Sequence, residues 1–158
     1  MKRLDLVIDS ELGNVSLLAV AVNRVCLQLG FDSLTAAHLE LCVAEAVTNS
    51  ICHAYHRVRG HTVKVTLAAD AGRLHVEVSD TGTPMGAEHQ QRLTRESSDS
   101  EIQTYDWRSL PEGGRGLKII RDLMDEVSYV SSENLNRLMM VKRLTPTGSR
   151  IDRDEHAG

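Results

Sequence analysis

Three polar side chains recur at four-residue spacing in one stretch of the sequence, and their chemistry suits phosphoryl transfer. On a helix, Glu45, Asn49 and His53 would follow one another at about 40° around the axis and form one stripe. A carboxylate can accept a proton from an attacking hydroxyl group, and an amide oxygen can ligate Mg²⁺. Glu45 is therefore the candidate catalytic base, and Asn49 is the candidate magnesium ligand.

The alternative explanation of this stripe is an ordinary solvated face, which every amphipathic helix has. The surrounding residues count against it, because a polar stripe this narrow on an otherwise apolar helix indicates a function for its carboxylate. For His53 the simpler explanation is a hydrogen bond to a carbonyl group, so it is not assigned to catalysis. The apolar neighbours of the stripe are Cys42, Val43, Ala44, Ala46, Val47 and Ile51.

A second candidate site is an acidic residue followed by a glycine where a strand pattern ends, Asp80-Thr81-Gly82. An ionised Asp80 only accepts hydrogen bonds, so it could bind the exocyclic amine of adenine and select it over guanine. Gly82 would let the backbone approach the base. The alternative is a plain turn, since Asp and Gly are common wherever a strand ends.

The third candidate is the run Gly113-Gly114-Arg115-Gly116-Leu117, at the point where a loop enters a helix. Glycines there expose consecutive backbone N–H groups, and the helix dipole and Arg115 add positive potential, which together favour a polyphosphate. A flexible hinge with a chance basic residue is the alternative.

The elements that must position these residues can be read from the periodicity. Residues 4–8 predict a first strand, and the cap-forming residues 9–11 predict a helix that Gly30 ends. A second capping cluster at Asp32 predicts a helix that runs to about Tyr55.

Strict alternation then predicts an antiparallel hairpin, and a long polar stretch separates it from the last helix and two more strands. We expect helices gathered on one face of a mixed, mostly antiparallel sheet, an α+β two-layer sandwich. The predicted segments are strands at 62–68 and 73–79, a short helix near 88–95, a helix from 113 to about 124, strands near 127–131 and 137–144 joined by a turn at 133–134, and a polar tail at 145–158.

Composition narrows the function classes. A chain of 158 residues is the size of one domain, expected at 1–144, and its net charge of −4 offers no footprint for nucleic acid. Three cysteines without metal spacing fit reduced thiols, and no segment resembles a signal peptide or a membrane span. These features predict a soluble cytoplasmic protein that does not bind membranes.

The three candidate segments, in this order, resemble the N, G1 and G2 boxes of the GHKL ATPase and kinase superfamily. The resemblance is strongest to anti-sigma factor serine kinases of the RsbW and SpoIIAB type, whose N box is similar to residues 45–55, and it covers about residues 4–144. It implies a Bergerat-type sandwich that binds ATP and Mg²⁺.

The resemblance also implies roles. Glu45 would be the base, Asn49 the magnesium ligand, Asp80 the adenine contact and the segment 82–113 the ATP lid. The protein would be a serine/threonine kinase that phosphorylates a STAS-domain antagonist, sequesters a sigma factor in partner switching, and forms a homodimer. The expected ATP-binding residues are Asn49, His53, Asp80, Gly82, Gly113, Gly114, Arg115, Gly116 and Leu117.

The sequence departs from the family pattern at two positions within these boxes. Pro84 stands where many members have a second glycine, which affects lid flexibility, and Ser50 stands where alanine is usual, which should not block a nucleotide. Two other functions fit parts of the sequence. One is an ATP-binding module that holds partners without transferring phosphate. The other is an aspartic protease turn at Asp80, which the helices in the first half of the chain disfavour.

Overall fold

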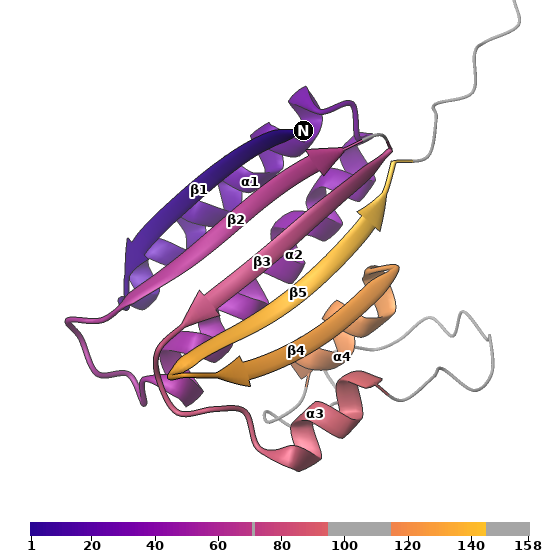
Figure 1. The fold of residues 1–158 in the computed structure, drawn as a ribbon. Helices are drawn as coiled ribbons and strands as arrows, with labels where there is room; N and C mark the ends of the chain where they lie inside the picture. Colours follow the sequence, from indigo (N-terminus) through magenta and orange to yellow (C-terminus); the bar gives the residue numbers. More distant parts are fainter. Residues whose placement is uncertain (71, 95–114, 145–158) are drawn as a thin grey trace, which may run out of the picture.

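The computed structural model describes residues 1–70, 72–94 and 115–144, and these form a five-stranded sheet in the order β1-β2-β3-β5-β4 (Figure 1). Every neighbouring pair is antiparallel, so the described sheet is not mixed as the sequence analysis allowed. The strands are β1 (Lys2–Asp9), β2 (Thr62–Asp70), β3 (Arg73–Asp80), β4 (Glu126–Ser132) and β5 (Leu135–Arg143).

The helices α1, α2 and α4 cover one face of this sheet, which gives the predicted α+β two-layer sandwich (Figure 1). The core lies between the layers and is almost entirely aliphatic, with Val22, Val43 and Ile120 fully enclosed. The helical segments are η1 (Leu12–Asn14), α1 (Val15–Gln28), α2 (Ser33–Asn49), η2 (Ser50–Ala54), α3 (Ala87–Thr94) and α4 (Arg115–Leu123).

Most predicted elements are present, with ends displaced by a few residues. The turn between β4 and β5 is the predicted one, and its two residues, Glu133 and Asn134, both have positive φ (50° and 64°). Positive φ at both central residues is the geometry that matches the twist of a two-residue hairpin. The predicted tail at 145–158 and most of the polar stretch lie outside the described residues.

The first helix begins later than predicted, because its expected cap has another use. The Ser10 hydroxyl donates to the Val58 carbonyl at 2.9 Å and accepts from the His61 N–H at 3.2 Å. It therefore ties the end of β1 to the loop before β2, and α1 follows only after the short turn η1. The helix ends as predicted, with Gly30 in the left-handed region at φ 96°.

The second helix starts at its predicted cap. Asp32 Oδ1 accepts hydrogen bonds from the N–H groups of Leu34 and Thr35 at 3.0 and 2.9 Å, which satisfies two donors of the first turn. Its last turn is wider than an α-helix: over Ser50–Ala54 the chain forms a π-helix, in which the Tyr55 N–H bonds the Ser50 carbonyl. Such π turns are often found at functional sites.

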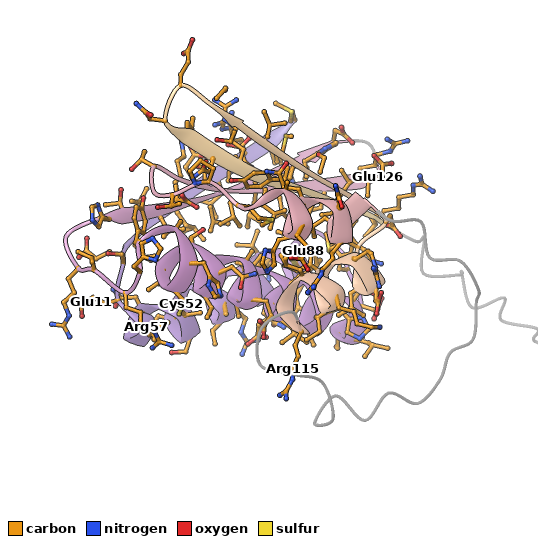
Figure 2. All side chains as sticks on the ribbon, turned by 90° about the horizontal axis from the view of Figure 1, so that it is seen from below. Glu11, Cys52, Arg57, Glu88, Arg115 and Glu126 are labelled. Atoms are coloured by element: carbon orange, nitrogen blue, oxygen red, sulfur yellow. The ribbon has the colours of Figure 1, made fainter. Side chains whose placement is uncertain are left out.

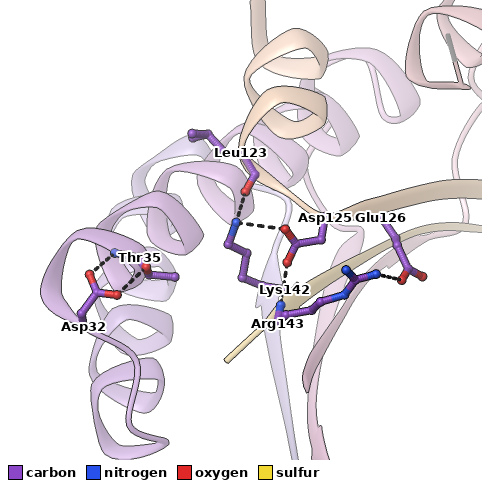
Figure 3. A network of polar contacts seen from close by, with 7 residues as sticks. All are labelled: Asp32, Thr35, Leu123, Asp125, Glu126, Lys142 and Arg143. Atoms are coloured by element: carbon purple, nitrogen blue, oxygen red, sulfur yellow. Dashed lines mark hydrogen bonds and ion pairs between the residues drawn. The ribbon is translucent and has the colours of Figure 1, made fainter. Parts of the chain in front are cut away.

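A polar network fixes the end of α4 against the sheet (Figure 3). The Lys142 ammonium group donates to the last carbonyl of α4, Leu123, at 2.7 Å, and to Asp125 at 3.5 Å. Asp125 in turn accepts from the Arg143 backbone N–H at 2.6 Å, and the Arg143 guanidinium pairs with Glu126 at 3.3 Å. These contacts satisfy a helix-end carbonyl and set the position of α4 beside β4.

In the part of the chain that the structure describes, no helix is both long enough and apolar enough to span a membrane.

Candidate functional site

The acid of the second candidate segment occupies a core position of the sheet. Along β3 the residues Leu74, Val76 and Val78 face the helices, and Asp80 takes the next position in this alternation, only 8% exposed. Strand register places Asn136 of β5 directly opposite Asp80, and Ser131 of β4 opposite Asn136. Three polar residues thus form one row across the sheet, at the edge of an apolar core.

Three donors hold the Asp80 carboxylate. Oδ1 accepts from the Asn136 amide at 2.7 Å and from the Gly82 N–H at 3.0 Å, and Oδ2 accepts from the Ser50 hydroxyl at 2.7 Å. Asn136 is itself held, because its Nδ2 also donates to the Gly82 carbonyl at 3.0 Å and its Oδ1 accepts from Ser131 at 2.8 Å. Burying a carboxylate without hydrogen-bond partners would be costly, and these donors supply the partners.

The π turn and the end of β3 are joined along their length. The Tyr55 hydroxyl accepts from the Thr81 N–H at 2.9 Å and donates to the Thr62 carbonyl at 2.8 Å. The Thr83 N–H bonds the Ala54 carbonyl at 2.9 Å. The π turn after α2 and the segment that follows β3 therefore form one wall of the candidate site, although the residues that bond each other are 26 to 30 positions apart in the sequence.

Gly82 is required in this wall for steric reasons. A Cβ atom placed on Gly82 would overlap the backbone carbonyl of Ala54 and lie 2.9 Å from the Ala54 Cβ. Only a residue without a side chain allows the two segments to approach this closely.

Glu45 lies on α2 against the N-terminus of α4. A Cβ atom placed on Gly116 would lie 2.5 Å from Glu45 Oε2, so the glycine leaves the space that the carboxylate occupies. Glu45 is half-buried and makes no hydrogen bond or ion pair within the described residues. Burial raises the pKa of its carboxyl group above the ordinary value of 4.5. A carboxylate with a raised pKa and no partner is the kind of group that can accept a proton.

Asn49 lies one turn beyond Glu45 on α2, and its amide is incompletely satisfied. Its Nδ2 atom is buried and is the one buried side-chain polar atom without a partner among the described residues. Leaving such an atom without a partner costs free energy, so native proteins rarely do so outside functional sites. The position is suited to a polar ligand.

The structure places the remaining predicted residues differently from one another. His53 is exposed on the π turn. The side chain of Leu117 is buried in the core, and its backbone belongs to the first turn of α4. Figure 2 shows Arg115 at the start of α4, directed away from the sheet. The predicted contacts Gly113 and Gly114 lie outside the described residues.

Sequence reasoning assigned no site role to Ser50 or Asn136, although both hold Asp80. The signal was available in the pattern: Ser50 continues the apolar spacing of α2, and Asn136 precedes Leu138 and Met140 in the alternation of β5. A polar residue at a core position needs a partner there.

A separate surface hollow of about 270 Å³ lies at the other end of β3, where Arg73, Phe31 and Leu144 line it. It contains none of the predicted site residues. The polar chemistry lies at the Asp80 end of the strand, and we therefore place the candidate site there.

Comparison with known sequences gives a consistent result. The sequence model of the histidine kinase-like ATPase domain matches residues 8–142. A protein named serine-protein kinase RsbW from Bacillus velezensis is 30% identical over 149 residues, which cover 94% of this chain and 89% of the relative. The protein of the same name from Bacillus subtilis is 29% identical, over 89% of this chain and 83% of the relative.

Solved structures share the fold. The RsbU and RsbW domains of a Mycobacterium tuberculosis protein superpose with a TM-score of 0.62 at 16% identity, over 91% of this chain and 32% of that longer chain. The catalytic domain of the histidine kinase ThkA superposes with a TM-score of 0.53 at 15% identity, over 92% of this chain and 98% of that domain. At these identities the likeness concerns the fold alone.

Proposed function

This chain belongs to the histidine kinase-like ATPase family, and from that premise we propose that it is an ATP-dependent serine/threonine protein kinase of the RsbW type. The proposal rests on one structural observation above all. Glu45 lies beside the N-terminus of α4, Asn49 lies one turn farther along α2, and neither side chain has a hydrogen-bond partner within the described residues.

We assign Glu45 as the base that accepts the proton of the attacking hydroxyl group. Its raised pKa is caused by desolvation, and this makes the carboxylate a stronger proton acceptor than an exposed glutamate. Gly116 leaves room for the carboxylate beside the helix N-terminus, where it would accept the proton.

Asn49 is suited to Mg²⁺. The described residues contain no group of three His, Cys, Asp or Glu side chains that could hold a metal ion by themselves. A magnesium ion that accompanies a nucleotide usually needs only one or two protein ligands, since phosphates and water supply the rest. The unsatisfied amide of Asn49 could supply its oxygen after a half-turn of the side chain. When bound, Mg²⁺ would neutralise phosphate charge during transfer.

We assign the adenine ring of ATP to the segment at Asp80 and Gly82, and the phosphates to the start of α4. The Asp80 carboxylate, held by the Asn136 amide and the Gly82 N–H, can accept a hydrogen bond from the adenine amine. Gly82 would let the backbone approach the adenine ring. The first turn of α4, which contains Gly116 and Leu117, is the positive end of a helix dipole, and such an end favours phosphate oxygens. His53 is exposed and would contact the nucleotide at most from its outer side.

For the partners we propose those of the RsbW-type regulators. The phosphate acceptor would be a serine or threonine of a STAS-domain anti-anti-sigma factor, and a sigma factor would be the protein released or held in response. We further propose that the protein acts as a homodimer in the cytoplasm. The three cysteines are free thiols, two of them buried, which is compatible with a reducing compartment.

The test is transfer of labelled γ-phosphate from ATP with Mg²⁺ to the STAS-domain proteins of the same organism. We expect transfer by the wild-type chain, and none with Glu45→Ala or after chelation of magnesium. ATP affinity is measured in parallel, and Glu45→Ala should retain it because the base contributes little to binding.

One further variant and two outcomes of the transfer experiment complete the test. Asp80→Asn should weaken ATP binding, and an unchanged dissociation constant for ATP would show that Asp80 does not contact adenine. If the wild type binds ATP tightly and no STAS-domain protein is labelled, the protein is an ATP-binding regulatory module, the other function the sequence allows. Transfer that persists in Glu45→Ala would exclude Glu45 as the base.

A further inference from the structure

The hydrogen bonds around Asp80 leave one acceptor position open. An ionised carboxylate has about two acceptor positions on each oxygen. Both positions of Oδ1 are filled, by the Asn136 amide and the Gly82 N–H, and one position of Oδ2 is filled by the Ser50 hydroxyl. A ligand that reaches this buried carboxylate therefore meets one free lone pair, on Oδ2.

The donors also prevent the carboxylate from turning. Ser50 approaches from the π turn after α2, and Asn136 from the neighbouring strand β5, so the two oxygens are held from different directions. The Asn136 amide cannot turn freely either, because Ser131 and the Gly82 carbonyl bind its two ends. Asp80 is only 8% exposed, so water has little access to compete.

We propose that Ser50 and Asn136 are specificity-determining positioning residues, which fix Asp80 so that its single open lone pair selects a 6-aminopurine over a 6-oxopurine nucleotide. This inference rests on the proposed function, since it assumes that the site binds ATP. The hydroxyl group of Ser50 is the donor to Oδ2, and the selection would depend on it.

The chemical reason is a mismatch of acceptors. Adenine presents an N–H donor at its 6-position, which fits the open lone pair of Oδ2. Hypoxanthine presents a carbonyl oxygen there, and its nearest donor is the ring N1–H, displaced to the side. A carboxylate held by three donors cannot turn to meet N1–H, and an acceptor facing an acceptor is disfavoured. A carboxylate that has lost Ser50 could turn and accept either base.

The experiment compares dissociation constants for ATP and inosine triphosphate, in the full-length wild type and in Ser50→Ala, Ser50→Thr and Asn136→Ala. We expect the wild type to prefer ATP, and we expect Ser50→Ala to reduce the ratio of the two constants about tenfold, the equivalent of ~1.4 kcal/mol. Asn136→Ala should reduce the ratio in the same direction. Ser50→Thr keeps a hydroxyl donor and should retain the wild-type preference for ATP over inosine triphosphate.

Ser16→Ala is the matched control, because Ser16 is an exposed serine on α1. Thermal unfolding of each variant separates positioning from folding. Equal weakening of both nucleotides in Ser50→Ala and Asn136→Ala would show a merely structural role and overturn the proposal. An unchanged ratio in both variants would do the same.

The wild type distinguishes this proposal from the proposed function. If it binds ATP and inosine triphosphate equally well, the selection by Asp80 is refuted and the kinase assignment stands. If it binds neither nucleotide, the proposed function fails and this inference fails with it.

Discussion

Gly116→Ala should slow phosphate transfer strongly while leaving the fold intact. The added methyl group would lie 2.5 Å from Glu45 Oε2, whereas ordinary contacts begin at 3.4 Å, so the carboxylate must move by about 1 Å. The atom that moves is the end of a flexible side chain, and the surrounding backbone need not shift. A displacement of about 1 Å in a catalytic group can reduce the rate roughly 10²-fold.

The free energy of unfolding of Gly116→Ala should stay near the wild-type value or rise slightly. Alanine is a better helix residue than glycine by roughly 0.5–1 kcal/mol, and this offsets the cost of moving the Glu45 side chain. The assay is γ-phosphate transfer to the STAS-domain substrate, with ATP affinity and the midpoint of urea unfolding measured on the same preparations. We expect kcat to fall about 10²-fold with an unfolding midpoint close to that of the wild type.

The matched control is Gly13→Ala, where an added Cβ meets no atom within 4 Å. It should leave both the rate and the unfolding midpoint near the wild-type values. A Gly116→Ala protein that folds normally and transfers phosphate at the wild-type rate would refute the reasoning, because the position of Glu45 would then not limit the reaction.

Three further predictions follow from the same structure. Gly82→Ala should cost about 1–3 kcal/mol of unfolding free energy in urea titrations, because its Cβ meets the Ala54 backbone, which cannot swing away; Gly86→Ala, with its nearest atom at 3.9 Å, should cost little. The acid limb of the transfer rate should lie above pH 4.5, since burial raises the pKa of Glu45 and only its ionised form accepts a proton, so a limb at or below that pH contradicts the assigned base. Asp32→Ala should lower the unfolding midpoint at pH 7, because the hydrogen bond from the Thr35 side chain holds the pKa of Asp32 below 3.8. The difference from wild type should fade as the pH falls through that lowered pKa, and a pH-independent difference would exclude a charged cap.

The fold could be predicted from the sequence wherever structure depends on near neighbours. Alternation gave β2 and β3, and the capping cluster at Asp32 gave the start of α2, because both patterns are set within a few residues. The start of α1 could not be predicted in this way. Ser10 has the right chemistry for a cap, but its hydroxyl group bonds Val58, 48 residues away, and no local pattern contains that choice.

The sequence likewise gave the residues of the candidate site but not the contacts between them. Residue chemistry and spacing were enough to select Glu45, Asn49 and Asp80 as candidates, and the order of the three segments was enough to suggest the family. Their mutual contacts were not contained in any single segment. Gly116 meets Glu45 only because α4 packs on α2, and the sequence alone suggested a phosphate role for that glycine without its steric one.

The sequence by itself determined which residue types stand at which positions of each helix and strand, since hydrophobic periodicity and caps act over a turn or a few residues. Only the tertiary structure decided which of them meet. Ser50 and Asn136 lie 30 and 56 residues from Asp80, and they reach its carboxylate because the π turn and the register of β5 against β3 bring them there. Contacts of that range depend on how layers pack and strands align, which is a property of the whole folded chain.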